Sequence, residues 1–196
     1  TAPSAFSITV TAKNNTVVNN KYNSTNDGID VVVPIADDAT LNSGNVKLEV
    51  SVDSGSNYSS IGATSYSISS VNTNLTCNIT NTQFTGAVSE GQTAVFRAKI
   101  TDIAGNITTS SNTLNLIRDQ TAGTVSDVTS SKTNGSYKAG EDIEIKIKFS
   151  ETVVVTGTPQ LALNSTDSGS AAIATFDTSL GTSGRSTTTN SNDTLH

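Results

Sequence analysis

The chain has 196 residues, a formal net charge of −6 and only 14% charged residues, while Val, Ile, Thr, Ser and Asn are abundant. An acidic chain without a basic cluster repels phosphate backbones, so the sequence argues against a nucleic-acid partner. The charge is too low for a disordered acidic tail, and no stretch is apolar enough to span a membrane, so no membrane contact is expected within these residues.

Short segments in which apolar and polar residues alternate recur along residues 1–119, separated by turns rich in Asn, Asp, Ser and Gly. Alternation at every second position predicts half-buried strands. Phe6, Ile8 and Val10 form the first strand, and a polar loop is expected over residues 14–28. The later strands are expected at residues 29–33, 46–52, 66–68, 75–79, 94–100 and 114–116.

The same alternation predicts which side chains face the core. In the strand 46–52, Lys47 and Glu49 are expected to point outward, and Arg97 and Lys99 do so in the strand 94–100. Cys77 shares a strand face with Leu75 and Ile79, which favours a buried core thiol. Phe84 is expected in a connecting segment, and no stretch has a convincing helical pattern.

About seven short strands with turn signals between them predict an antiparallel two-sheet sandwich. The linker Thr121-Ala122-Gly123 is similar to the opening Thr1-Ala2-Pro3, and a short alternating strand follows each. We therefore predict an all-β fold of tandem immunoglobulin-like β-sandwiches, one over residues 1–119 and a partial second one over residues 120–196.

The second unit contains about four or five candidate strands, which is too few for a closed sandwich. They lie at residues 125–128, 143–149, 153–155, 161–163 and 173–176, and residues 177–194 are nearly without apolar side chains. An open sheet exposes an unpaired edge, which proteins normally avoid. The sequence therefore predicts either a truncated domain or a strand supplied by a neighbouring molecule.

Two motifs occur along the chain. The first is Asp102 followed by IAGN at 103–106, with DQTA at 119–122; the second is FSETV at 149–153 with TGTPQL at 156–161. Both resemble bacterial Ig-like repeats of large surface adhesins of the biofilm-associated type. One departure is Gly123, where the repeats usually carry the proline seen at Pro3.

The resemblance implies an extracellular, cell-surface stalk whose partners are neighbouring repeats of the same chain and other copies of the protein. Two alternatives stay open. One is a self-assembling filament or surface-layer subunit, in which a neighbour's strand completes the second domain. The other is a binding module appended to a secreted hydrolase.

An enzymatic role is not expected. The only histidine is His196 and the only cysteine is Cys77, so neither a Ser-His-acid triad nor a zinc cluster can be assembled. The adjacent carboxylates at 37–38 and 141–142 point to opposite faces of a strand, so neither pair flanks one bond. No phosphate-binding glycine motif is present.

Calcium is the one cofactor that the resemblance implies, because such repeats often hold it at domain junctions. Its candidate ligands are Asp102, Asn106 and Asp119, and carboxylate and amide oxygens suit calcium. The alternative is ordinary turn chemistry, in which Asp and Asn bond their own backbone. A second, weaker candidate set contains Asp27, Asp30, Asp37 and Asp38. Asn-x-Ser/Thr triplets leave glycosylation open.

Overall fold

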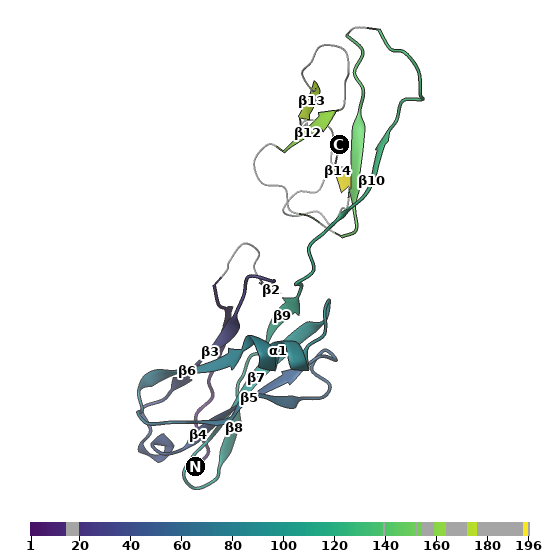
Figure 1. The fold of residues 1–196 in the computed structure, drawn as a ribbon. Coiled ribbons are helices and arrows are strands. Elements are labelled where there is room, and N and C mark those ends of the chain that lie inside the picture. The colour runs from purple at the N-terminus through teal and green to yellow at the C-terminus, as the bar shows by residue number, and fades with distance from the viewer. Residues whose placement is uncertain are drawn as a thin grey trace. The chain divides into compact units, whose positions relative to one another are not determined.

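The computed structural model describes residues 1–14, 20–138, 140–151, 153, 159–163, 172–175 and 194–195. The chain divides into two compact units, Thr1–Thr121 and Ala122–His196, close to the expected boundary at 119/120 (Figure 1). With 47% strand and 7% helix, the all-β fold is confirmed. No helix in the described part of the chain has the length and apolar character needed to cross a membrane.

The first unit contains two sheets. The small sheet has the order β1 (Thr9–Ala12), β3 (Gly28–Ile35), β6 (Thr73–Thr80). The large sheet has the order β2 (Lys21–Tyr22), β9 (Leu114–Arg118), β7 (Thr93–Thr101), β4 (Asn45–Ser51), β5 (Ser59–Ser67), and β8 (Ile107–Thr109) also pairs with β7. The β3–β6 pair in the small sheet and the β4–β7 pair in the large sheet are both antiparallel.

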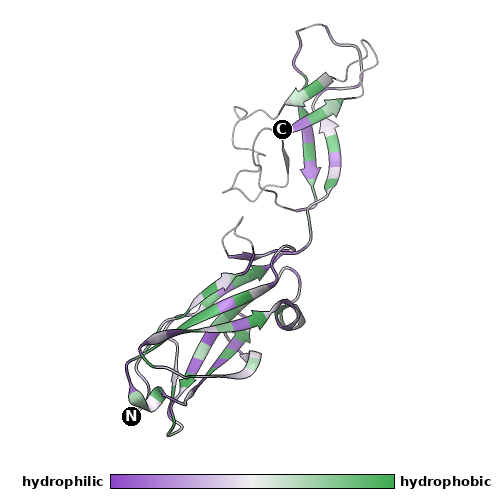
Figure 2. Ribbon diagram, turned by 60° about the vertical axis from the view of Figure 1, so that its left-hand side comes forward, coloured by the Kyte–Doolittle hydropathy of each residue, from purple (hydrophilic) through white to green (hydrophobic). Residues whose placement is uncertain are grey.

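The predicted alternation is seen in the core of the first unit. Figure 2 shows hydrophobic and hydrophilic residues alternating along its strands. The buried apolar residues come from both sheets and include Ile29, Val31 and Val33 on β3, Val46, Leu48 and Val50 on β4, and Ala94, Phe96, Ala98 and Ile100 on β7. Cys77 is fully buried on β6, as predicted, and burial raises the pKa of its thiol to about 12.

The expectation that no helix forms is wrong. Helix α1 (Asn81–Ala87) follows β6, and Phe84, expected in a connection, is its fully buried residue. The Thr80 hydroxyl accepts from the Gln83 amide while the Gln83 side chain accepts from the Thr80 amide, which is a capping box. Seven residues cannot form a stable helix alone, so the packing of Phe84 between Tyr22 and Phe96 holds it.

The polar loop expected over residues 14–28 also contains a strand. β2 pairs in parallel with β9, and Tyr22 is fully buried beside Phe84. The Tyr22 hydroxyl donates to Asn81 Oδ1 at 2.9 Å and lies 3.2 Å from the Asn26 carbonyl, a second acceptor for its one proton. A single aromatic side chain, that of Tyr22, therefore packs this segment against the core. The residues around it are polar, so the sequence shows no alternating pattern there.

The N-terminal segment contacts the large sheet before it joins the small one. Ser111 N donates to the Phe6 carbonyl at 2.8 Å, and Thr108 Oγ1 donates to the Pro3 carbonyl at 2.6 Å. The predicted first strand therefore begins only at Thr9, although Phe6 and Ile8 are buried. The segment thus spans both sheets at the edge of the sandwich.

The second unit is described in part. β10 (Val125–Ser130), β11 (Ile145–Phe149) and β14 (Thr194–Leu195) form one antiparallel sheet, and β12 (Gln160–Leu163) pairs with β13 (Ala172–Thr175). These strands agree with four of the expected segments. The expected strand at 153–155 and the segment 177–193 lie outside the described residues, apart from Val153.

A short 3₁₀ helix, η1 (Ala39–Leu41), lies in the first unit.

Candidate functional site

The predicted calcium ligands Asp102 and Asn106 lie together in the turn after β7. Asp102 is 4% exposed, and its carboxylate accepts from Ala104 N at 2.9 Å, Asn106 N at 2.8 Å and Asn106 Nδ2 at 2.8 Å. The Asn106 side chain, with the two amides, lowers the pKa of Asp102 despite the opposing effect of burial. These contacts are the turn chemistry that the sequence offers as the alternative to a metal site.

The third predicted ligand, Asp119, is not part of this turn. Asp119 follows β9, whose Ile117 pairs with Thr93 at the other end of β7 from Asp102. Along the nine residues of β7 this is a separation of about 27 Å. Asp119 instead pairs with Lys21 Nζ at 3.0 Å.

The three predicted ligands therefore do not form one site. Among the residues that the structure describes, no group of three or more His, Cys, Asp or Glu is placed to hold a metal. Calcium stays a prediction, restricted to the Asp102–Asn106 turn. Thermal melting with and without a chelator tests it, and an unchanged midpoint would remove it.

The second candidate set is also dispersed. Asp27 precedes β3 and accepts from Asn14 Nδ2 at 2.6 Å, while Asp30, on β3, accepts from Asn78 Nδ2 at 3.0 Å. Asp37 and Asp38 follow the far end of β3, where Asp38 caps η1 through the Thr40 amide. Hydrogen bonds within the first unit account for three of these four carboxylates, and only that of Asp38 is local in sequence.

Four residues where the chain leaves the first unit form what we call the exit bracket: Glu90, Arg118, Gln120 and Thr121. Glu90 Oε1 accepts from the amides of Gln120 at 2.7 Å and Thr121 at 3.0 Å, and Glu90 Oε2 lies 3.5 Å from Arg118 Nε. Burial acts to raise the pKa of Glu90, but these amides and the Arg118 charge outweigh it and lower the pKa.

Arg118 connects the exit bracket to the core of the unit. Its Nη1 donates to the carbonyls of Thr85 at 3.0 Å and Val88 at 2.7 Å, and its Nε donates to Gln120 Oε1 at 2.9 Å. The last residues of the first unit are therefore held to α1 and to the turn after it. No pattern in the sequence indicates this bracket, because Glu90 and Arg118 are 28 positions apart and neither lies in a motif.

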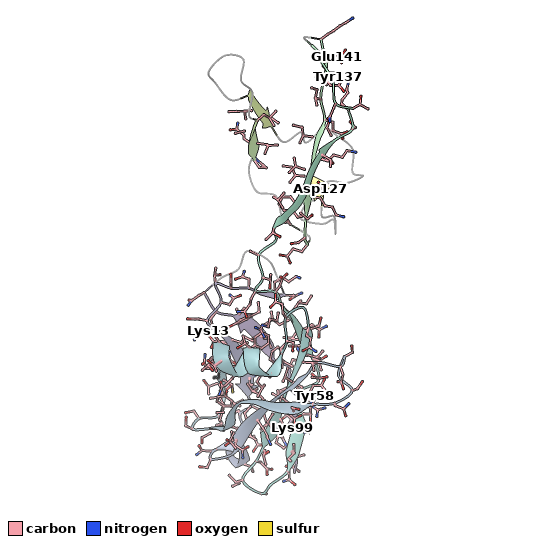
Figure 3. The ribbon with its side chains drawn as sticks, turned by 45° about the vertical axis from the view of Figure 1, so that its right-hand side comes forward. Lys13, Tyr58, Lys99, Asp127, Tyr137 and Glu141 are labelled. Carbon is pink, nitrogen blue, oxygen red and sulfur yellow. The ribbon has the colours of Figure 1, made fainter. Side chains whose placement is uncertain are left out.

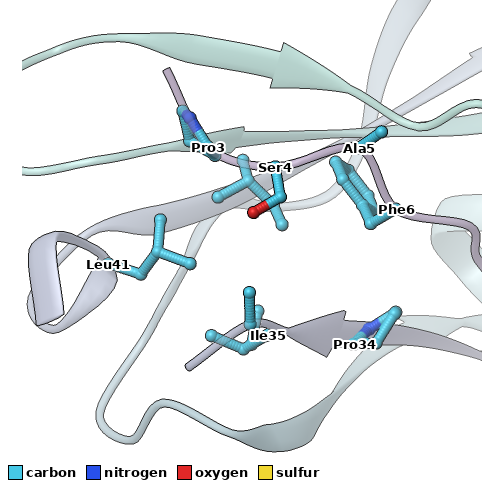
Figure 4. Close-up of a pocket in the computed structure, with 9 residues that line it drawn as sticks. Pro3, Ser4, Ala5, Phe6, Pro34, Ile35 and Leu41 are labelled. Carbon is cyan, nitrogen blue, oxygen red and sulfur yellow. The ribbon is translucent and has the colours of Figure 1, made fainter. Parts of the chain in front are cut away.

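An apolar hollow of about 160 Å³ lies where the N-terminal segment crosses the end of β3 (Figure 4). Its lining comes from that segment, β3 and its end, η1 and β7, and consists of Pro3, Ser4, Ala5, Phe6, Pro34, Ile35, Ala36, Leu41 and Ile100. The hollow has no acidic, basic, His or Cys side chain in its lining. Its volume is below the usual range for a ligand pocket.

The outer face of the large sheet carries a group of charges that come from different strands and lie far apart in the sequence. Glu49, expected to point outward, is only 9% exposed, because Arg97 Nε contacts its Oε2 at 2.6 Å and Lys99 Nζ its Oε1 at 2.9 Å. Burial acts to raise the pKa of Glu49, but these two cations outweigh it and lower the pKa. The Arg97 guanidinium also lies 3.6 Å from the centre of the Tyr58 ring.

Comparisons with known proteins add nothing to these observations. No protein-family model matches the chain, and neither a curated protein nor a solved structure matches it. What this protein does must therefore be argued from its own geometry.

Proposed function

We propose that this chain is a stalk segment of an extracellular surface protein, in which Ig-like units follow one another and hold a distal domain away from the cell. The observation that carries the proposal is the path of the chain through the first unit. The N-terminal segment enters beside the Asp102–Asn106 turn, where Asn106 Nδ2 lies 3.5 Å from the Thr1 carbonyl. The chain leaves after β9, at the other end of β7.

This path suits a serial repeat, because each unit then advances the chain by the length of its sheet. The advance is about 27 Å for the nine residues of β7. A unit whose ends lay together would instead form a side branch. The exit bracket supports the same role, since it holds Gln120 and Thr121, the last residues of the unit, to Glu90.

Small-angle X-ray scattering and sedimentation velocity of the full chain test the stalk. A compact chain of this length has a radius of gyration of about 16 Å. We expect a monomer with a clearly larger value at every concentration. A value near 16 Å would contradict the proposal. Antibody labelling of intact cells tests the surface location, and labelling only after lysis would contradict it.

A filament subunit is the second candidate, and the second unit favours it. Val125 and Val128 on β10 are 56% and 51% exposed, and Ile143 is 49% exposed. Among the described strands β10 lies at an edge of its sheet, where a neighbour's strand could pair. Sedimentation separates the two candidates, because a strand acceptor forms larger species as its concentration rises.

A further inference from the structure

We propose that the outer face of the large sheet binds an acidic polysaccharide whose sugars carry carboxylates. The site consists of a cation cluster (Lys47, Arg97 and Lys99) and a polar hollow beside it. The proposal does not depend on the stalk role, because it concerns one face of the first unit only.

The cation cluster arises from the register of two strands. Lys47 on β4 lies directly opposite Lys99 on β7, and Glu49 lies opposite Arg97. Like charges directly opposite each other destabilise a sheet, so the Lys47–Lys99 pair lowers the stability of the first unit. Folding alone gives no reason for this pair. With Glu49 as the only acid among the four, the face keeps a local charge of about +2 on a chain of net charge −6.

Two of the three cations, Lys47 and Arg97, keep hydrogen-bond donors that a ligand could use. The side chain of Lys47 makes no hydrogen bond or ion pair with any residue that the structure describes, and Lys47 is half-buried. The hydrogen bond of Arg97 to Glu49 uses Nε, and Tyr58 covers one face of the guanidinium. The edge of Arg97 with its two terminal nitrogens is the part that pairs with carboxylates in a fork.

The polar hollow continues the same face toward the start of β7. It has a volume of about 450 Å³, and Val95, two positions before Arg97, forms part of its floor. Its other lining residues are mostly hydroxyl and amide side chains: Val52, Ser54, Gln92, Thr93, Thr113 and Asn115. Hydroxyls and amides both donate and accept hydrogen bonds, which matches the hydroxyl groups of a sugar.

These features favour a saccharide over other anions. A nucleic-acid duplex carries one charge per about 1.7 Å of its axis, whereas a carboxylated polysaccharide carries at most one charge per sugar and also brings hydroxyls for the hollow. Tyr58 sits in the same face and holds Arg97 in place (Tyr58 and Lys99 are labelled in Figure 3). Figure 3 labels Lys13 as well, which follows β1 of the small sheet and serves below as a control.

Binding of the full chain to sodium alginate, with neutral dextran as the reference polymer, tests the proposal by biolayer interferometry. We expect binding to alginate only, weakened as sodium chloride rises from about 50 to about 500 mM. Lys47→Gln with Lys99→Gln should lower the affinity about tenfold. Lys13→Gln with Lys138→Gln, which removes the same charge elsewhere, should leave the affinity within about twofold.

Glu49→Gln provides a test of the opposite sign. This variant removes the acid that neutralises Arg97 and Lys99, so alginate should bind more tightly while the melting temperature falls. A variant that only unfolded the sheet would weaken binding instead. Melting curves of all variants identify any loss of fold.

Four results would overturn the proposal. They are no alginate binding by the wild-type chain, equal binding to dextran, an equal loss in the control variant, and unchanged affinity after Lys47→Gln with Lys99→Gln. Binding of poly-glutamate but not of alginate would assign the face to acidic peptides. Self-association that the same double variant abolishes would assign it to a second copy of the chain.

Discussion

Single Asp residues stabilise the turns of the first unit by bonding the chain close to them. Asp53, in the turn after β4, accepts from Ser51 Oγ at 2.6 Å, Asn57 N at 2.9 Å and Asn57 Nδ2 at 2.7 Å. Asp102 and Asp38 do the same in their own turns. These Asp residues stabilise turns, so the residue types that could bind a metal occur in the sequence for a structural reason.

The Asp53 turn predicts a specific pH dependence. The Ser51 hydroxyl and the Asn57 amides lower the pKa of Asp53 to about 2. Because the folded pKa lies below the ordinary value of 3.8, the carboxylate stabilises the fold above about pH 4 and loses this effect as pH falls toward 2. Urea unfolding of wild type and Asp53→Asn should differ at pH 7 and converge near pH 2. A difference that persisted at pH 2 would contradict this assignment.

At the scale of elements, α1 is stabilised by its one buried side chain and its cap. Phe84→Ala should lower the free energy of unfolding by about 3–5 kcal/mol, because it removes a ring packed between Tyr22 and Phe96. Thr80→Ala should lower it by about 1 kcal/mol through loss of the capping box. Chemical denaturation measures both changes.

Thr82→Ala is the matched control, because Thr82 lies exposed in the same helix. Its effect should stay within about 0.5 kcal/mol. If Phe84→Ala cost no more than this control, α1 would not be part of the core.

The exit bracket predicts local order where the chain leaves the first unit. Glu90→Ala removes the acceptor for the amides of Gln120 and Thr121, so both should become mobile on the ps–ns timescale. Backbone heteronuclear NOE values measure this change. Glu90→Gln keeps an oxygen acceptor but loses the charge pair with Arg118, so a smaller decrease is expected.

Acid should have the same effect as the Glu90→Ala variant. Because the pKa of Glu90 in the folded protein lies below its ordinary value, the carboxylate stays ionised and binds the two amides at neutral pH and through part of the pH range in which a glutamate ordinarily titrates. It releases them only in stronger acid. Unchanged NOE values in Glu90→Ala would show that the linker is held by other contacts.

At the scale of the whole molecule, the first unit contains a complete core. Every residue of its buried cluster lies between Phe6 and Leu116. Residues 1–121 expressed alone should therefore unfold cooperatively, at the midpoint of the corresponding transition in the full chain. Differential scanning calorimetry measures both. A fragment that unfolded without a cooperative transition would show that the first unit depends on the second.

The sequence alone determined the strands with a clear alternation, namely β3, β4, β6, β7 and β9, and their core-facing residues, but not β2, β8 or most of β5. Alternation in segments such as 46–50 and 94–100 reflects a physical period of two, which any strand with one buried face must follow. It also correctly placed Cys77 in the core. The alternating pattern does not predict burial where a segment has only one buried side chain, as for Tyr22 and Phe84. One aromatic residue among polar residues gives no repeating pattern.

Only the tertiary structure decided which charges meet. The sequence places Lys47 and Lys99 on outward faces of two strands, but the register that sets them opposite each other depends on how β4 and β7 pair. The same holds for the separation of Asp119 from Asp102, and for the contact between Glu90 and the linker. Local patterns report on neighbours along the chain, whereas sites depend on distances across the fold, which strand pairing sets.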